Sequence, residues 1–171
     1  MVHVAFVMDP IDSLNLKKDS TLAMIRAAQV RGWRVSYLEQ KDLAWQDGAA
    51  VGYLRELTLA PGLVEMLSGS FDASAVPDPW YELGTEQRVN LGDIEVLMMR
   101  KDPPFDMDYI YTTYLLERAE ADGALVVNRP QSLRDCNEKF FATAFAQFQP
   151  PLLVSRPVSY THLTLPTRLP V

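Results

Sequence analysis

Short apolar segments that alternate with predicted helices are the feature that most constrains the fold of this chain. Residues 2–8, 94–99 and 124–127 are short and carry little charge, which is typical of strands buried on both faces of a parallel sheet. Residues 33–38 form a further predicted strand. Because strands that alternate with helices indicate right-handed βαβ units, we predict an α/β fold: a three-layer, Rossmann-like domain with a mostly parallel sheet.

The predicted helices have recognisable ends. Each begins after a residue that can cap it: Asp19 or Ser20, Asp106 or Asp108, and Ser132. The first closes at Gly32 and the second at Gly123, while the third reaches about Phe148. In the second helix, the side chains that recur at helical spacing are Ile110, Tyr114, Leu115 and Arg118.

A hairpin is predicted between the second strand and the third. Residues 43–45 and 51–59 flank a turn at Gln46-Asp47-Gly48, and an Asp-Gly pair is a strong hairpin signal. Residues 63–92 are irregular and receive no assignment. A last strand is predicted to start at Leu152.

The charge of the chain limits the partners that it can have. It carries 16 Lys and Arg against 22 Asp and Glu, a formal net charge of −6, whereas nucleic-acid binding needs a basic surface. No apolar run reaches the roughly 18 residues of a membrane span. The single cysteine, Cys136, excludes an internal disulfide and fits a reducing compartment. We therefore expect a cytoplasmic protein that binds neither nucleic acid nor membrane.

Polar segments that contain proline follow three of the predicted strands. The residues at these positions are Asp9, Arg100, Lys101, Asp102, Asn128 and Arg129. Parallel strands bring their carboxyl ends to one edge of a sheet, where ligands bind in open α/β folds. With Lys17 and Lys18 from the first loop, the cationic groups predict a small anionic ligand. The alternative is that Arg100 and Lys101 pair with nearby aspartates as a solvated cap.

Other signals for chemistry are weaker. Neither G-x-G-x-x-G nor G-x-x-x-x-G-K-[ST] occurs, so no dinucleotide fingerprint or P-loop is predicted. No His, Cys and Asp cluster has metal-ligand spacing, and we predict no metal-binding residue. His3 is interpreted as a structural residue of the first strand. Cys136 is interpreted as a structural thiol, since no histidine base can be assigned to it.

Several longer segments resemble one enzyme family. They are MDP at 8–10, KKDS at 17–20, MRKDPPFD at 99–106 and VNRPQSLRDCNEK at 127–139. Together they closely resemble prokaryotic glutathione synthetase, from residue 1 to about residue 156. The similarity is weakest in residues 44–92.

This resemblance implies an ATP-grasp ligase that uses ATP and Mg2+ to join γ-glutamylcysteine and glycine into glutathione through an acyl phosphate. It implies that residues 1–128 are a Rossmann-like pre-ATP-grasp domain, that residues 129–156 begin the ATP-grasp domain, and that the intact enzyme is a homo-oligomer. Lys139 matches a family lysine that contacts ATP. The substrate-cleft candidates are Asp9, Arg100, Lys101, Asp102 and Asn128.

The resemblance stops before the end of the chain. Residues 157–171 follow neither helical nor strand periodicity, and VSYTHLTLPT resembles translated adaptor or vector read-through. We expect these residues to be a non-native, disordered tail; a flexible native tail is the alternative. The family continues past the position of Arg156 with its nucleotide loop and magnesium ligands. We therefore expect a truncated chain that holds no catalytic residue and is inactive alone.

Two other functions stay open at this point. One is a stand-alone Rossmann-like module that binds a small anion and catalyses nothing. The other is a subunit that contributes only an oligomer interface. Phosphate release from ATP in the presence of γ-glutamylcysteine and glycine would contradict the expectation of an inactive chain.

Overall fold

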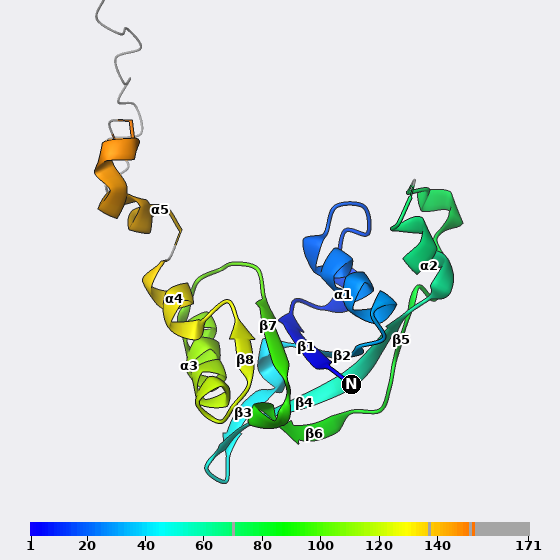
Figure 1. Cartoon of the computed structure of the whole chain (residues 1–171), viewed down its shortest axis with the longest axis horizontal. Coiled ribbons are helices and arrows are strands. Elements are labelled where there is room, and N and C mark those ends of the chain that lie inside the picture. Colours follow the sequence, from blue (N-terminus) through cyan, green and yellow to red (C-terminus); the bar gives the residue numbers. More distant parts are fainter. Residues whose placement is uncertain (70, 137, 151, 153–171) are drawn as a thin grey trace, which may run out of the picture. The chain divides into compact units, whose positions relative to one another are not determined.

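A computed structural model describes residues 1–69, 71–136, 138–150 and 152 of the chain (Figure 1). The chain divides into two compact units, residues 1–134 and residues 135–171. The first unit contains the sheet and the helices that cover it. Among the described residues, no helix is both long enough and apolar enough to cross a membrane.

Four parallel strands form one half of the sheet, in the order β2-β1-β7-β8. Their bounds are β1 His3–Met8, β2 Arg34–Leu38, β7 Val96–Arg100 and β8 Leu125–Val127. Two crossover helices join them, α1 (Ser20–Val30) and α3 (Met107–Ala121), which are capped by the side chains of Asp19 and Asp106 as predicted. The α/β, Rossmann-like prediction is confirmed for this part of the chain.

The other half of the sheet is antiparallel and is organised by one long strand. Its strands are β3 Leu43–Gln46, β4 Ala49–Leu59, β5 Tyr81–Leu83 and β6 Gln87–Asn90. Strand β4 pairs with β3, β6, β2 and β5 at successive places along its length. The predicted hairpin is confirmed, and Asp47 and Gly48 at its turn both have positive φ angles, 54° and 81°. The described sheet as a whole is therefore mixed, and the mostly parallel arrangement predicted from the sequence holds only for its β2-β1-β7-β8 half.

Helices cover both faces of the sheet, which gives the predicted three layers (Figure 1). On one face, Phe6 and Met8 of β1 share a core with α1 and with α2 (Pro61–Met66). On the other face, Ala5 and Val7 share a core with Leu116 of α3. Successive residues of β1 thus point to opposite layers, as the pleat of a strand requires.

The side of α3 that packs on the sheet differs from the stripe noticed in the sequence. Its buried residues are Thr112, Thr113, Leu116 and Ala119, whereas Tyr114 is exposed. The Thr112 hydroxyl donates to the carbonyl of Asp108, and the Thr113 hydroxyl donates to the carbonyl of Ile110. Because each hydroxyl has a partner within the helix, both threonines can be buried at little cost.

The segments between and after these elements contain short helices. The 3-10 helices are η1 Ile11–Ser13, η2 Gln40–Asp42, η3 Ala73–Ala75, η4 Leu91–Asp93 and η5 Ala142–Phe148. The unassigned region 63–92 therefore contains most of α2, the strands β5 and β6, the 3-10 helix η3 and the start of η4.

The predicted helix from Ser132 to Phe148 is wrong in its start and in its continuity. Helix α4 spans Pro130–Asp135, so Ser132 lies inside it and proline takes the first position, where its missing N–H costs nothing. Helix α5 (Glu138–Phe141) and then η5 follow. Of the strand predicted from Leu152, only that residue is described, and the predicted tail at 157–171 lies outside the described residues.

Candidate functional site

The register of the parallel strands brings their carboxyl ends to one edge of the sheet. Met8 at the end of β1 pairs with Arg100 at the end of β7. Val127 at the end of β8 pairs with Met98. The polar segments that follow these strands therefore start from the same edge, as the sequence predicted.

Asp9 and Lys101 meet at this edge and tie together the loops after β1 and β7. The Lys101 Nζ lies 2.9 Å from Asp9 Oδ1, and the Asp102 N–H donates to Asp9 Oδ2 over 2.9 Å. Lys101 Nζ also donates to the Asp102 carbonyl at 2.6 Å. The Lys101 side chain is only 16% exposed, so the pair is partly shielded from water. Both carboxylate oxygens of Asp9 thus have a partner within the chain.

Arg100 leaves the same strand end toward the other face of the sheet. Its Nε donates to Thr21 Oγ1 at 3.1 Å and its Nη2 donates to Ser20 Oγ at 2.7 Å. These hydroxyls belong to the first turn of α1, which lies on that face. Lys17 and Lys18 are exposed in the loop before this helix. The structure therefore divides the predicted cationic cluster between two faces.

The remaining predicted residues do not join Asp9 and Lys101. Asn128 is exposed and does not line the pocket described below. Arg129 Nε lies 3.4 Å from Glu120 Oε1 of α3, and this ion pair is largely exposed. Lys139 lies in α5, and its side chain is outside the described part of the structure. Its predicted contact with ATP stays a prediction.

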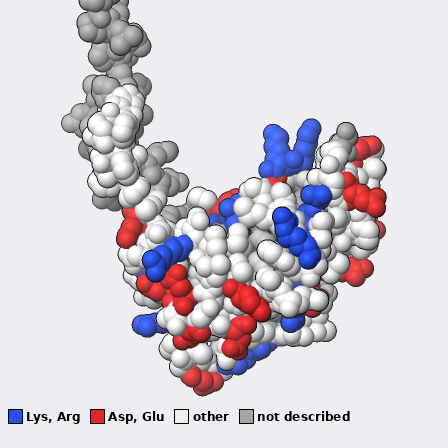
Figure 2. Space-filling model, in the orientation of Figure 1, with Lys and Arg blue, Asp and Glu red and all other residues white. Residues whose placement is uncertain are grey.

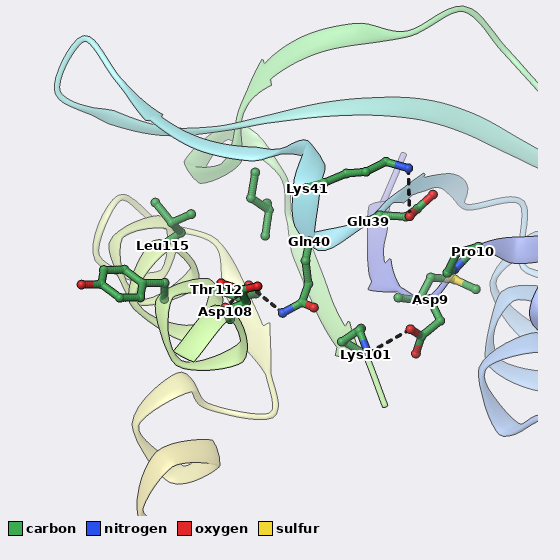
Figure 3. A pocket seen from close by; sticks show the side chains of 12 residues that line it. Asp9, Pro10, Glu39, Gln40, Lys41, Lys101, Asp108, Thr112 and Leu115 are labelled. Carbon is green, nitrogen blue, oxygen red and sulfur yellow. Dashed lines mark hydrogen bonds and ion pairs between the residues drawn. The ribbon is translucent and has the colours of Figure 1, made fainter. Parts of the chain in front are cut away.

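A pocket of about 520 Å3 opens beside the Asp9–Lys101 pair, between the strand ends and α3 (Figure 3). Its lining residues are Met8, Asp9, Pro10, Glu39, Gln40, Lys41, Leu43, Lys101, Asp108, Tyr111, Thr112 and Leu115. A volume of this order is typical of small-molecule sites. Two of the predicted cleft residues, Asp9 and Lys101, therefore line a real cavity.

The sequence prediction missed the wall that follows β2. Glu39 Oε2 lies 3.1 Å from Lys41 Nζ, and Gln40 Nε2 donates to Thr112 Oγ1 of α3 at 3.0 Å (Figure 3). The signal was present, because a run of four polar residues, Glu39 to Asp42, directly follows the predicted second strand. It was overlooked because no proline stands there.

Tyr37 fixes the Glu39 side chain of this wall through a hydrogen bond. Its side chain is buried, and its hydroxyl donates to Glu39 Oε1 at 2.8 Å. The Ile11 N–H donates to the same hydroxyl at 3.4 Å, a long contact. Burial, followed by the bond to the Glu39 carboxylate, raises the pKa of Tyr37 well above its usual value of 10.0. The phenol therefore stays protonated and keeps donating to Glu39 throughout the neutral pH range.

Charges of both signs lie on the surface of the first unit. Figure 2 shows basic and acidic side chains interspersed on the face in view. Within the described ranges, no group of three or more His, Cys, Asp or Glu side chains could hold a metal ion. The described residues of the pocket could instead offer carboxylates, ammonium groups and hydroxyls to a polar organic ligand.

Comparison with known proteins gives the family of this fold. Residues 2–134 match the model of the family described as prokaryotic glutathione synthetase, N-terminal domain. The chain belongs to this family. The match covers all of the parallel strands and the whole pocket wall, so the family resemblance noted in the sequence is confirmed.

Curated relatives support the same conclusion. Over 155 residues the chain is 54% identical to the glutathione synthetase of Pseudomonas putida, a match that covers 91% of this chain and 44% of the relative. Over 156 residues it is 46% identical to the glutathione synthetase of Salmonella typhimurium and 45% identical to that of Vibrio vulnificus, covering 91% of this chain and 45% of each. The chain spans less than half the length of these relatives.

Proposed function

We propose that this chain supplies the N-terminal wall of a glutathione synthetase active site. The whole protein would join γ-glutamylcysteine and glycine with the hydrolysis of ATP. The pocket at the carboxyl edge, lined by Asp9 and Lys101, is the observation that carries this proposal, because open α/β sheets bind their ligands there.

Within this proposal, the chain's own residues bind and orient substrate. ATP, held with Mg2+, would supply the phosphoryl group that activates a carboxylate. Lys139 is proposed to reach ATP, and the substrate cleft to include Asp9 and Lys101. Arg100, Asp102 and Asn128, which do not line the pocket, would contact substrate only at its margin.

A chimera tests this proposal directly. Residues 1–156 would replace the matched N-terminal part of the Pseudomonas putida relative, to which 155 residues of this chain are 54% identical. We expect the chimera to release phosphate from ATP only when both γ-glutamylcysteine and glycine are present. The 171-residue chain alone should release none. A folded chimera without activity would contradict the proposal.

Two further properties follow from the same proposal. The intact enzyme would be cytoplasmic. It would also be a homo-oligomer, and sedimentation of the chimera would test this oligomeric state. The alternative function, a small-anion module without catalysis, is favoured by one feature, the exposed Lys17 and Lys18 in the loop before α1, the helix whose first turn binds Arg100. An inactive chimera whose N-terminal unit still bound inorganic phosphate near α1 would support that alternative.

A further inference from the structure

The Asp9 and Glu39 carboxylates of the pocket both have partners within the chain, but their lysine partners differ in exposure. Asp9 has a partner on both oxygens, the Lys101 ammonium on one and the Asp102 N–H on the other. Glu39 accepts from the buried Tyr37 hydroxyl on Oε1 and from the Asp42 N–H in a capping box, and its Oε2 lies 3.1 Å from the ammonium of Lys41. The side chain of Lys41 is 71% exposed, against 20% for Glu39. Ion pairs with such an exposed partner contribute little and exchange easily.

The charges of the pocket do not balance. Its lining contains the carboxylates of Asp9, Glu39 and Asp108 against the ammonium groups of Lys41 and Lys101. An empty pocket of this composition has one surplus negative charge, which favours a ligand with a cationic group. A ligand ammonium that took the place of Lys41 on Glu39 would also free Lys41 to bind an anionic group.

We propose that Glu39 is a specificity-determining residue that binds the α-ammonium group of a γ-glutamyl substrate, and that Tyr37 is the residue that positions it. The substrate's α-carboxylate then pairs with Lys41. Binding thus replaces the Glu39–Lys41 ion pair with two others, one between Glu39 and the substrate ammonium and one between Lys41 and the substrate carboxylate. This inference rests on the proposed function for the substrate class, but the choice of Glu39 over Asp9 comes from the exposure of the lysine partner, which is 71% for Lys41 and 16% for Lys101.

The positioning role of Tyr37 has a geometric basis. A glutamate side chain loses conformational freedom when it binds a ligand, which weakens binding. The hydroxyl of Tyr37, fixed in the core of the α1 face, already holds one Glu39 oxygen in place. The other oxygen is thereby oriented before a ligand arrives, as shown by the Glu39–Lys41 contact in Figure 3.

The test uses the 171-residue chain and two probes, γ-glutamylcysteine kept reduced and its N-acetyl derivative, which lacks the ammonium charge. Titrations followed by backbone amide shifts of Gln40, Lys41 and Thr112 report binding in the pocket. We expect the free amine to bind at least about tenfold more tightly than the acetylated probe, because a hydrogen bond between charged groups is lost on acetylation.

Variants separate the roles of the two residues. Glu39→Gln should abolish the preference for the free amine, weakening that probe about tenfold and leaving the acetylated probe nearly unchanged. Tyr37→Phe should reduce the preference several-fold. A merely structural role would instead weaken both probes alike. Glu82→Gln, in a separate groove formed around β5, is the matched control and should change neither.

Two results would overturn the inference: equal affinity for both probes in the parent chain, or an unchanged preference in Glu39→Gln. A dipeptide that shifts no pocket amide would overturn it as well. Each of these results leaves the proposed function standing if the chimera is active. Conversely, an inactive chimera together with a pocket that still prefers the free amine would remove the proposed function and retain the ammonium site.

Discussion

Arg100 and Lys101 are neighbours in sequence, but they belong to opposite faces of the sheet. Lys101 pairs with Asp9 beside the pocket on the α3 side, whereas Arg100 binds the hydroxyls of Ser20 and Thr21 on the α1 side. A pocket opens on the α3 side, whereas on the α1 side the Arg100 guanidinium is hydrogen-bonded to the first turn of the helix. A run of like charges at a strand end can therefore serve two purposes, one at a cavity and one in fastening a helix.

The strongest test of this difference removes the carboxylate on the pocket side. Asp9→Ala would leave the partly buried Lys101 ammonium and the Asp102 N–H without their partner, so we expect a loss of about 1–3 kcal/mol in the free energy of unfolding. Urea titration of the parent and variant measures it. Asp9→Asn, which keeps an oxygen for the Asp102 N–H, should lose less. Equal losses for the two variants would contradict the stabilising role assigned to the hydrogen bond from the Asp102 N–H.

A smaller loss is expected on the α1 side. Arg100→Ala removes two hydrogen bonds to hydroxyl groups at a partly exposed site, which should cost about 1 kcal/mol. The backbone amide shifts that Arg100→Ala changes should belong to the first turn of α1, whereas those that Asp9→Ala changes should belong to residues around the pocket. Lys18→Ala, an exposed residue of the neighbouring loop, is the control and should change stability by less than about 0.5 kcal/mol. Shift changes from Arg100→Ala that reach Gln40 or Thr112 would show that the two faces are not independent.

The smallest change in stability should come from His3, at the opposite end of β1, and should leave both faces of the sheet unchanged. His3 Nε2 lies 2.8 Å from Ser36 Oγ, and burial, followed by the charge of Arg34, lowers the pKa of His3 from 6.5. Because the folded chain binds this proton less readily than the unfolded chain, protonation favours unfolding. The contribution of His3 is fully present above the unfolded pKa and is lost as the pH falls below about 6.5.

The free energy of unfolding, measured at several pH values between about 7.5 and 5.5, tests this expectation. The parent chain should become less stable as the pH falls through this range, and His3→Gln should flatten the profile because glutamine does not titrate. An unchanged profile in the variant would assign the pH dependence to other groups. The amide shifts of Gln40 and Thr112 should stay constant over the same range.

The sequence was sufficient for the parallel half of the sheet, because its strands are short and apolar and two of them, β1 and β7, lead into helices with capping aspartates. It was also sufficient for the hairpin, since few residues other than Asp and Gly accept the backbone angles of Asp47 and Gly48. Residues 63–92 were out of reach because β5 and β6 are short and are defined by pairing with β4 rather than by their own pattern. Local sequence does not contain that information.

The candidate site was predicted in outline and misjudged in detail. The convergence of Asp9 and Lys101 followed from the direction of the strands. The separation of Arg100 from Lys101 could have been predicted as well, because successive side chains of a strand point to opposite faces. The buried Thr112 could not, since its burial depends on a hydroxyl bond inside α3. Glu39 was missed because the polar run that follows β2 contains no proline, unlike the segments that follow β1, β7 and β8.

The pairing of β4 has a consequence for the order in which the fold opens. Each residue from Ala49 to Leu59 has a ladder partner, supplied in turn by β3, β6, β2 and β5. Strand β8, by contrast, has three residues and pairs along one side only within the described sheet. In deuterated water, the amides of β8 should therefore exchange through local fraying, while those of β4 wait for global unfolding. Between these two strands, protection from exchange should therefore be much greater in β4, which belongs to the antiparallel half of the sheet.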